Sequence, residues 1–339
     1  MNSSGKALEV PGNLLLAGEY AITLEKRRGI TFAAGPPVRV HLEPAEHFRL
    51  RARFGLRDEA EDRRSPVFTA ALNLFADPIR FEEIAARAGT PAAQEATARR
   101  SAFDRNSSLP ALSITVDSSS LFTPGGRKLG FGSSAAAAVG TIAALLTAVD
   151  IDPVADRRLT ALLATAAHRD AQNGAGSGYD VATSCFGGIG LFTGGRWPDY
   201  ERIDPVWLPP LGITSGEFPE STSGAISCFR RALETDETRI SGLLDQSDQA
   251  VHAFAAAADW QDGRRALERS REVGVEIGRA IGVPAEVLPE TVYGENHGIC
   301  GDRFMKALGA GRETIGLLPY LPDCGDAAVP CDMEGLRWA

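Results

Sequence analysis

A glycine-rich loop that runs directly into an alanine-rich segment constrains the fold of this chain more than any other stretch. Four glycines fall within residues 125–132, and because glycine permits backbone angles that other residues avoid, this stretch cannot form ordinary helix or strand. Residues 135–149 are strong helix formers with apolar residues at helical spacing. Such a loop presents free N–H groups and the positive end of the helix dipole, which predicts an anion site, most often a phosphate site.

The residues within the loop narrow the kind of site. A Walker loop needs Lys-Ser/Thr after its last glycine, whereas Lys128 precedes the last two glycines here. A dinucleotide fingerprint needs an acidic residue on a second strand, and Asp150 instead ends the helix. Ser133 and Ser134 can cap the helix, and a hydroxyl there can reach a phosphate-bound metal ion. The alternative interpretation is a glycine loop that merely enters a buried helix.

Residues 130–136 resemble the Gly-Leu-Gly-Ser-Ser-Ala-Ala signature of the GHMP kinases (galactokinase, homoserine, mevalonate and phosphomevalonate kinases), with Phe131 in place of leucine. The resemblance implies that the cofactors are ATP and Mg²⁺, that Lys128 neutralises the triphosphate and that Ser134 is a metal ligand. It also implies a set of nucleotide-binding residues, which are Gly130, Gly132, Ser133, Ser134 and Ala135.

A second segment, residues 14–22, is an apolar run that contains one acid, Glu19. An acid in such surroundings needs a partner or a task, unless it is a solvated carboxylate at the end of an element. The segment resembles the first GHMP motif, and its Gly-Glu-Tyr-Ala form resembles phosphomevalonate kinases, which implies a substrate-binding role for Glu19. The family lysine that follows Pro-Gly is Asn13 in this chain. Either Lys128 or Lys6 then supplies the positive charge, or turnover depends less on it.

A third segment, Gly176-Ser177-Gly178-Tyr179-Asp180, makes a glycine-rich turn with one acid. It resembles the region of phosphomevalonate kinases that bears the catalytic aspartate, which implies that Asp180 activates the acceptor and that Ser177 binds substrate. The alternative is that Asp180 caps a helix. His168 is interpreted as a packing or hydrogen-bonding residue, and Asp170 is a nearby candidate for the metal-binding acid of mevalonate kinases.

Two further segments resemble the family near the substrate phosphates. Ser221, Thr222 and Ser223 resemble a phosphomevalonate kinase segment whose hydroxyls lie near the substrate phosphate, although hydroxyls at a helix start also serve as caps. Residues 309–313 resemble the third GHMP motif, with Arg312-Glu313 in place of glycines; Arg312 either binds phosphate or pairs with Glu313. The substrate-binding residues implied by this second segment are Gly309, Ala310, Gly311 and Arg312.

The family resemblance implies an α+β fold, and the chain-wide pattern predicts both strands and helices. We expect strands at 6–10, 111–116, 206–216 and 314–318 and in the alternating region 30–56, and helices at 66–76, 79–88, 135–149, 238–258, 262–281 and 302–308. Residues 89–108 are expected to be partly loop, and residues 321–339 a surface extension. The family resemblance implies an N-terminal domain like ribosomal S5 domain 2 (residues 1–205) and a ferredoxin-like C-terminal domain (residues 206–339).

Composition limits the class of partner. The 339 residues carry a net charge of −9, which argues against a nucleic-acid partner. The five cysteines include no C-x-x-C pair, so neither a disulfide framework nor a zinc site is expected. No apolar run approaches the ~20 residues of a membrane span, and the first residues lack the pattern of a signal peptide. We therefore expect a cytoplasmic protein with a small-molecule substrate. The sequence does not decide between a monomer and a homodimer.

Together, the three motifs identify the chain as resembling a GHMP-superfamily small-molecule kinase. The resemblance implies transfer of the ATP γ-phosphoryl group to a small acceptor, with Asp180 and Lys128 as catalytic residues. Phosphomevalonate is the first candidate acceptor, mevalonate the second and another GHMP substrate the third. A protein of this fold that binds ligand without turnover, or a regulator, is the alternative that Asn13 and Arg312 favour.

Overall fold

The computed structural model describes most of the chain and divides it into two compact units. The described residues are 5–54, 57–59, 65–100, 111–174, 176–215, 222–283, 285, 303–308, 314–322 and 327–339. The first unit comprises residues 1–13, 35–187 and 332–339, and the second comprises 14–34 and 188–331. Both are discontinuous in sequence, unlike the predicted domains, and the boundary near residue 205 stays a prediction.

The first unit is built on a six-stranded sheet in the order β14-β1-β4-β7-β5-β6. The pairs are antiparallel except β5 with β7, which is parallel. Alternation in the central strand explains its placement, because Val38, Val40 and Leu42 are buried while the residues between them are exposed. The strands are β1 (Lys6–Val10), β4 (Val38–Pro44), β5 (Arg49–Phe54), β6 (Arg57–Glu59), β7 (Leu112–Asp117) and β14 (Arg337–Trp338).

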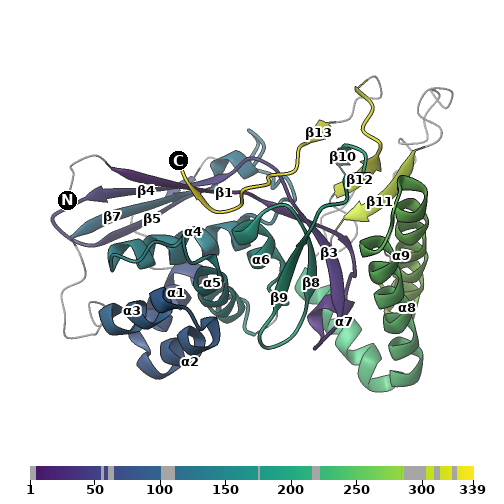
Figure 1. Cartoon of the computed structure of the whole chain (residues 1–339), viewed down its shortest axis with the longest axis horizontal. Coiled ribbons are helices and arrows are strands. Elements are labelled where there is room, and N and C mark those ends of the chain that lie inside the picture. The colour runs from purple at the N-terminus through teal and green to yellow at the C-terminus, as the bar shows by residue number, and fades with distance from the viewer. Residues whose placement is uncertain are drawn as a thin grey trace. The chain divides into compact units, whose positions relative to one another are not determined.

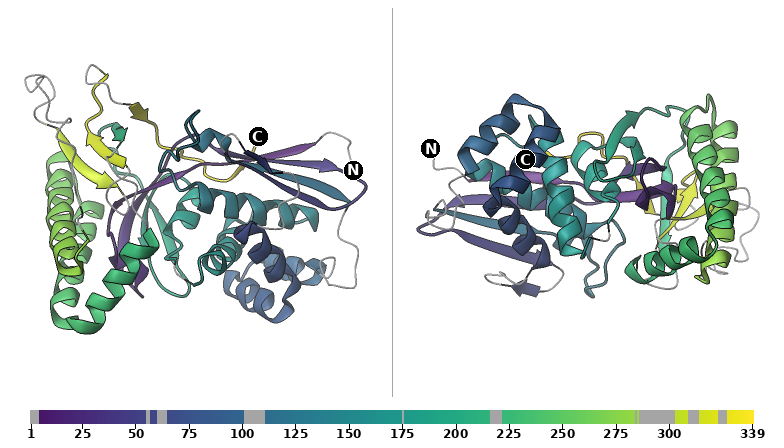
Figure 2. Two further views of the ribbon diagram at one scale, coloured as in Figure 1. Left: turned by 180° about the vertical axis from the view of Figure 1, so that it is seen from behind. Right: turned by 90° about the horizontal axis from the view of Figure 1, so that it is seen from below.

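Helices cover one face of this sheet (Figures 1 and 2). The central one, α4, is buried on nearly all sides, and its Gly140 permits close approach to the sheet because a Cβ there would lie 2.6 Å from Val40 Cγ2. The helices are α1 (Pro66–Ala76), α2 (Pro78–Ala88), α3 (Pro91–Arg99), α4 (Ser133–Ala148), α5 (Arg157–Ala171) and α6 (Tyr179–Phe186), with a 3₁₀ turn η3 (Ser119–Leu121).

Helix α3 occupies residues 91–99 of the stretch 89–108, which was expected to be partly loop; residues 101–108 lie outside the described residues. Thr90 accepts a hydrogen bond from the backbone N–H of Ala93, and Pro91 occupies the first turn. This Thr-Pro pair is a recognised helix-start signal that the alanine- and arginine-rich composition obscured.

The C-terminal residues also differ from the expected surface extension. Leu336 is fully buried in the first unit, and the Arg157 guanidinium donates two hydrogen bonds to its carbonyl oxygen, at 3.1 and 2.7 Å. Arg337 pairs with Glu9 at 2.8 Å where β14 lies beside β1. The low hydrophobicity of the segment hid this role, because backbone pairing and two arginines hold it in place.

The second unit contains two four-stranded sheets, β2-β3-β8-β9 and β11-β12-β10-β13. Residues 302–308 were expected to form a helix, but Phe304–Leu308 is strand β11 and pairs antiparallel with β12. Five residues are too few for apolar spacing to separate helix from strand, so the neighbouring strand decides. The strands are β2 (Asn13–Ala17), β3 (Arg28–Ala33), β8 (Ile189–Thr193), β9 (Asp199–Ile203), β10 (Leu211–Ser215), β11 (Phe304–Leu308), β12 (Thr314–Leu318) and β13 (Ala327–Val329).

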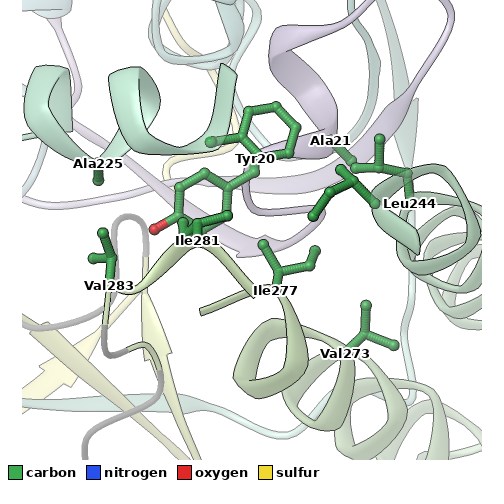
Figure 3. Packing of buried hydrophobic residues seen from close by; sticks show 10 residues of the cluster. Tyr20, Ala21, Ala225, Leu244, Val273, Ile277, Ile281 and Val283 are labelled. Carbon is green, nitrogen blue, oxygen red and sulfur yellow. The ribbon is translucent and has the colours of Figure 1, made fainter. Parts of the chain in front are cut away.

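Three helices complete the second unit: α7 (Thr222–Thr235), α8 (Glu237–Ala255) and α9 (Trp260–Ile281). They share an apolar core with the 3₁₀ turn η1 (Ala21–Thr23) (Figure 3). In this core the Tyr20 and Phe229 ring centroids are 5.4 Å apart. Tyr20 has a φ of 63°, a conformation that costs free energy in a bulky residue and is maintained here by packing. Within the part of the chain that the structure describes, no helix has the length and apolar character of a membrane span.

Candidate functional site

The glycine loop of the first unit has a fixed conformation at the start of α4. Gly132 is the N-cap residue with φ 63°, in the left-handed region that favours glycine. A Cβ on Gly132 would lie 2.3 Å from Asn13 Nδ2. Asn13 is itself fixed, because its side chain donates to Ser184 Oγ at 3.0 Å and its backbone N–H donates to the carbonyl oxygen of Phe131 at 3.0 Å. Asn13, at the position of the family lysine, thus supports the loop from beneath.

The two serines follow the cap rather than form it. Ser133 and Ser134 occupy the first turn of α4, where no side chain makes a capping hydrogen bond, so the expectation that they cap the helix is wrong. Ser134 is exposed. Ala135 is buried, and its N–H donates to the carbonyl oxygen of Gly132 at 3.1 Å. The serine hydroxyls therefore remain available for other partners.

A pocket of about 720 Å³ opens beside this helix start. Its polar side includes Ser133, Ser134 and Lys128, and Lys128 is exposed. Its apolar side comes from β5, α1, β7 and the residue that follows η3, and the end of α5 contributes as well. The apolar residues are Ala52, Val67, Phe68, Val116 and Phe122. An apolar wall next to a helix N-terminus suits a molecule that has a flat hydrophobic part and an anionic part.

Asp180 lies in the first turn of α6, whose N-cap is Gly178 with φ 88°. The Asp180 side chain is 23% exposed, and its Oδ1 accepts a hydrogen bond from the N–H of Val181 at 2.9 Å. The turn before it is held by Arg169, whose guanidinium donates to the carbonyl oxygens of Gly176 (2.9 Å) and Ser177 (2.7 Å). Arg169 therefore fixes the backbone that presents Asp180, a role that the sequence did not reveal.

Asp180 and Ser134 meet at one histidine. His168 on α5 is 2% exposed; its Nε2 lies 3.2 Å from Ser134 Oγ, and its Nδ1 lies 3.6 Å from Asp180 Oδ2. Gln172 Nε2 lies 3.1 Å from His168 Nε2. The interpretation of His168 as a hydrogen-bonding residue is confirmed, but its two partners could not be found from sequence, because three separate helices bring them together.

Asp170, the candidate for a metal-binding acid, is engaged elsewhere. Its carboxylate accepts two hydrogen bonds from the Arg80 guanidinium, one at 2.9 Å. These hydrogen bonds raise the pKa of Arg80. Over the described residues, no group of three or more histidine, cysteine, aspartate or glutamate side chains is arranged to hold a metal ion.

In the second unit, Glu19 lies in a buried ion pair. Its carboxylate pairs with the Nζ of Lys306 on β11, and the two residues are 9% and 2% exposed. Lys306 Nζ also donates to the carbonyl oxygen of Ala307 at 3.3 Å. The expectation that Glu19 needs a partner is confirmed; its substrate-binding role stays a prediction.

Several predicted residues lie outside the described residues or have no described side chain. Thr222 and Ser223 begin α7, but their side chains are not described. The others lie outside the described residues: Ser221, Gly309, Ala310, Gly311 and Arg312.

A family model of known proteins matches the part of the chain that contains this site. Residues 92–188, the stretch that carries the loop, α4, His168 and Asp180, match the family model "GHMP kinases N terminal domain". No curated protein matches the sequence.

Solved structures match over nearly the whole chain. The Lin0012 protein from Listeria innocua has a TM-score of 0.76 at 18% identity, covering 99% of each chain. Phosphomevalonate kinase from Streptococcus pneumoniae, in complex with phosphomevalonate and AMPPNP, has a TM-score of 0.67 at 14% identity and covers 96% of this chain and 99% of its own. Mevalonate kinase from L. major, in complex with R-mevalonate, has a TM-score of 0.60 at 15% identity, covering 94% and 88%. The chain therefore has the α+β fold of the GHMP kinases, and its residues 92–188 correspond to their N-terminal domain.

Proposed function

We propose that this protein is an ATP-dependent phosphotransferase acting on a small molecule. The observation that carries the proposal is the pocket at the start of α4, which joins an apolar wall to Lys128 and two serines in front of a helix N-terminus. An adenosine group suits the apolar wall, and a triphosphate suits the helix end and the lysine. The match of residues 92–188 to the GHMP kinase N-terminal domain supports the same activity.

The residues divide the chemistry among them. An oxygen of the acceptor, which is a phosphate oxygen in phosphomevalonate and a hydroxyl oxygen in mevalonate, attacks the γ-phosphorus. The bond from that phosphorus to the β,γ-bridging oxygen breaks, and ADP leaves with that oxygen. Asp180 orients the attacking oxygen and, where that oxygen carries a proton, accepts the hydrogen bond and finally the proton. Lys128 and the loop N–H groups stabilise the charge on the phosphate oxygens.

The same residues fit a magnesium ion with the nucleotide. Mg²⁺ prefers oxygen ligands and is usually bound through one or two protein groups together with substrate phosphates. The exposed Ser134 hydroxyl is such a group. When bound, the ion neutralises phosphate charge.

The acceptor we propose is phosphomevalonate, with diphosphomevalonate as the product, which gives the protein a place in isoprenoid biosynthesis. The support is the Gly-Glu-Tyr-Ala and Gly-Ser-Gly-Tyr-Asp segments, together with the fold shared with the S. pneumoniae phosphomevalonate kinase. Mevalonate is the second candidate, because mevalonate kinases share the fold at similar identity. A binding protein without turnover is the alternative to any kinase, since Asn13 stands in place of the family lysine.

The test is ATP consumption with Mg²⁺ against a panel of acceptors that includes phosphomevalonate, mevalonate and homoserine. We expect turnover with phosphomevalonate; turnover with another member reassigns the acceptor, and no turnover despite ATP binding favours the binding protein. Gly132→Val is the loop variant, because its side chain would collide with Asn13. Gly174→Ala is the matched control, since Gly174 also has positive φ (83°) but a Cβ there meets nothing within 4 Å. Calorimetry with ATP should show binding in the control and loss of binding in Gly132→Val.

A further inference from the structure

We propose that His168 is a positioning residue, which holds Asp180 through one ring nitrogen and Ser134 through the other. This inference rests on the proposed function. Its basis is that a single buried ring contacts both the hydroxyl of Ser134, which lines the pocket, and the carboxylate of Asp180.

The donor and acceptor properties of Ser134, His168 and Asp180 determine which group donates each hydrogen bond. An ionised carboxylate only accepts hydrogen bonds, so the ring nitrogen that faces Asp180, Nδ1, must carry the proton. In the neutral ring, Nε2 then has a lone pair and accepts from the Ser134 hydroxyl at 3.2 Å. The contact from Nδ1 to Asp180 measures 3.6 Å, and contacts of this kind are often long before substrate binds.

Gln172 allows the Ser134 hydroxyl to break its hydrogen bond with His168 without disturbing the ring. Its Nε2 lies 3.1 Å from the same ring nitrogen and can donate to the same lone pair. When a nucleotide or cation draws the Ser134 hydroxyl away, Gln172 keeps the lone pair occupied and so preserves the proton on Nδ1. The orientation of Asp180 is thereby independent of whether Ser134 is bound to a ligand.

The His168 ring and the backbone before Asp180 are both held in place. His168 is 2% exposed, and the next residue, Arg169, clamps the turn before Asp180 through two hydrogen bonds. One turn of α5 therefore sets both the backbone and the side-chain direction of Asp180. Groups that orient a reacting residue in this way typically contribute about 10–100-fold to activity or ligand affinity.

Two substitutions separate the two contacts. In His168→Asn the amide occupies the position of Nδ1, so it can serve Asp180 but not Ser134. In His168→Gln the amide reaches the position of Nε2, so it can serve Ser134 but not Asp180. We expect His168→Gln to lower kcat about 10–100-fold with little change in KM for ATP, and His168→Asn to raise KM for ATP about 10-fold with kcat nearly retained.

Thr165→Val is the matched control, because Thr165 is a buried polar residue one turn earlier on α5 (3% exposed) and should leave both constants unchanged. The readout without turnover is the ¹⁵N spectrum of the histidine rings, which should show the Nδ1–H tautomer for His168. An Nε2–H tautomer would overturn the proposal, and so would variants whose constants match wild type or change together in proportion to a loss of thermal stability. A wild-type protein that neither binds nor consumes ATP would instead remove the proposed function, and this inference with it.

Discussion

Asp180 and Glu19 are two acids in similar glycine-containing segments, yet the two units use them differently. Glu19 is buried in the second unit against the Nζ of Lys306, itself buried. Asp180, in the first unit, has a side chain that is 23% exposed and faces an imidazole rather than an ammonium group. A carboxylate that pairs with a buried cation is neutralised within the fold. A carboxylate held by a ring and partly open to solvent keeps capacity for a ligand.

The difference also concerns energy. Removing one partner of a buried ion pair leaves an uncompensated charge, which costs more than the pair itself contributes. Loss of an oriented general base instead changes the barrier of a reaction and need not change the free energy of unfolding. The comparison therefore predicts that replacing Glu19 lowers mainly stability, whereas replacing Asp180 lowers mainly activity.

The largest effect is expected for Asp180→Asn. The amide preserves the shape of the side chain but removes the charge and the basic site, so kcat should fall by about 10²–10⁴. ATP affinity and melting temperature should remain close to wild type, because the substitution keeps the two hydrogen bonds from Arg169 to the backbone before α6. Steady-state kinetics with phosphomevalonate and a thermal melt measure both. A stable variant with wild-type kcat would mean that Asp180 is structural and that the two acids do not differ.

Glu19→Gln should have the second largest effect, on stability. The substitution removes the carboxylate charge that pairs with the buried Lys306 ammonium, and we expect a loss of about 3–5 kcal/mol in the free energy of unfolding. Urea denaturation checks this value. Unchanged stability combined with a raised KM for the acceptor would restore Glu19 as a substrate-binding residue and break the comparison from the other side.

Lys128→Met tests a cation that, like Asp180, is expected to affect activity rather than stability. Lys128 is exposed and lines the pocket, so its removal should lower kcat about 10-fold while changing stability by less than about 0.5 kcal/mol. Lys6→Met is the control, because Lys6 Nζ lies 5.5 Å from the Trp338 ring centroid on the sheet of the first unit. Normal turnover in Lys128→Met together with lost turnover in Lys6→Met would transfer the role to Lys6.

The smallest effect is expected when both members of the buried pair are replaced. Glu19→Leu combined with Lys306→Met removes both charges, and a buried ion pair is often replaceable by apolar residues at little cost. The double variant should therefore lie within about 1 kcal/mol of wild type, well above the sum of its single variants. Additive losses in a double-mutant cycle would show that the two side chains do not act as a pair.

Local patterns predicted much of this structure. The alternation of apolar and polar residues predicted the strand that contains Val38, Val40 and Leu42. The glycine loop followed by the alanine-rich run predicted α4. The errors lie where distant segments decide: residues 304–308 become strand because β12 lies beside them, and Leu336 is buried because Arg157 binds its carbonyl oxygen. Fold class, where short signals add up, is therefore more predictable than the partner of a single segment.

The candidate site shows the same limit. Ser134 and Asp180 could be named from motifs, because each motif is contiguous in sequence. His168 and Arg169 could not be given their roles, since those roles depend on how α4, α5 and α6 face each other. The Glu19–Lys306 pair was likewise beyond reach, because its members are separated by most of the chain.

The last strand has a consequence for synthesis on the ribosome. Residues 332–339 complete the first unit, although the second unit is encoded between them and residue 187. At about 5–20 residues per second, the nascent first unit waits on the order of ten seconds for β14 and for the Leu336 carbonyl that Arg157 binds. During that wait β1 is an edge strand with Glu9 unpaired from Arg337, and an open edge invites pairing with another chain. The first unit is therefore open to misassembly until residues 332–339 emerge.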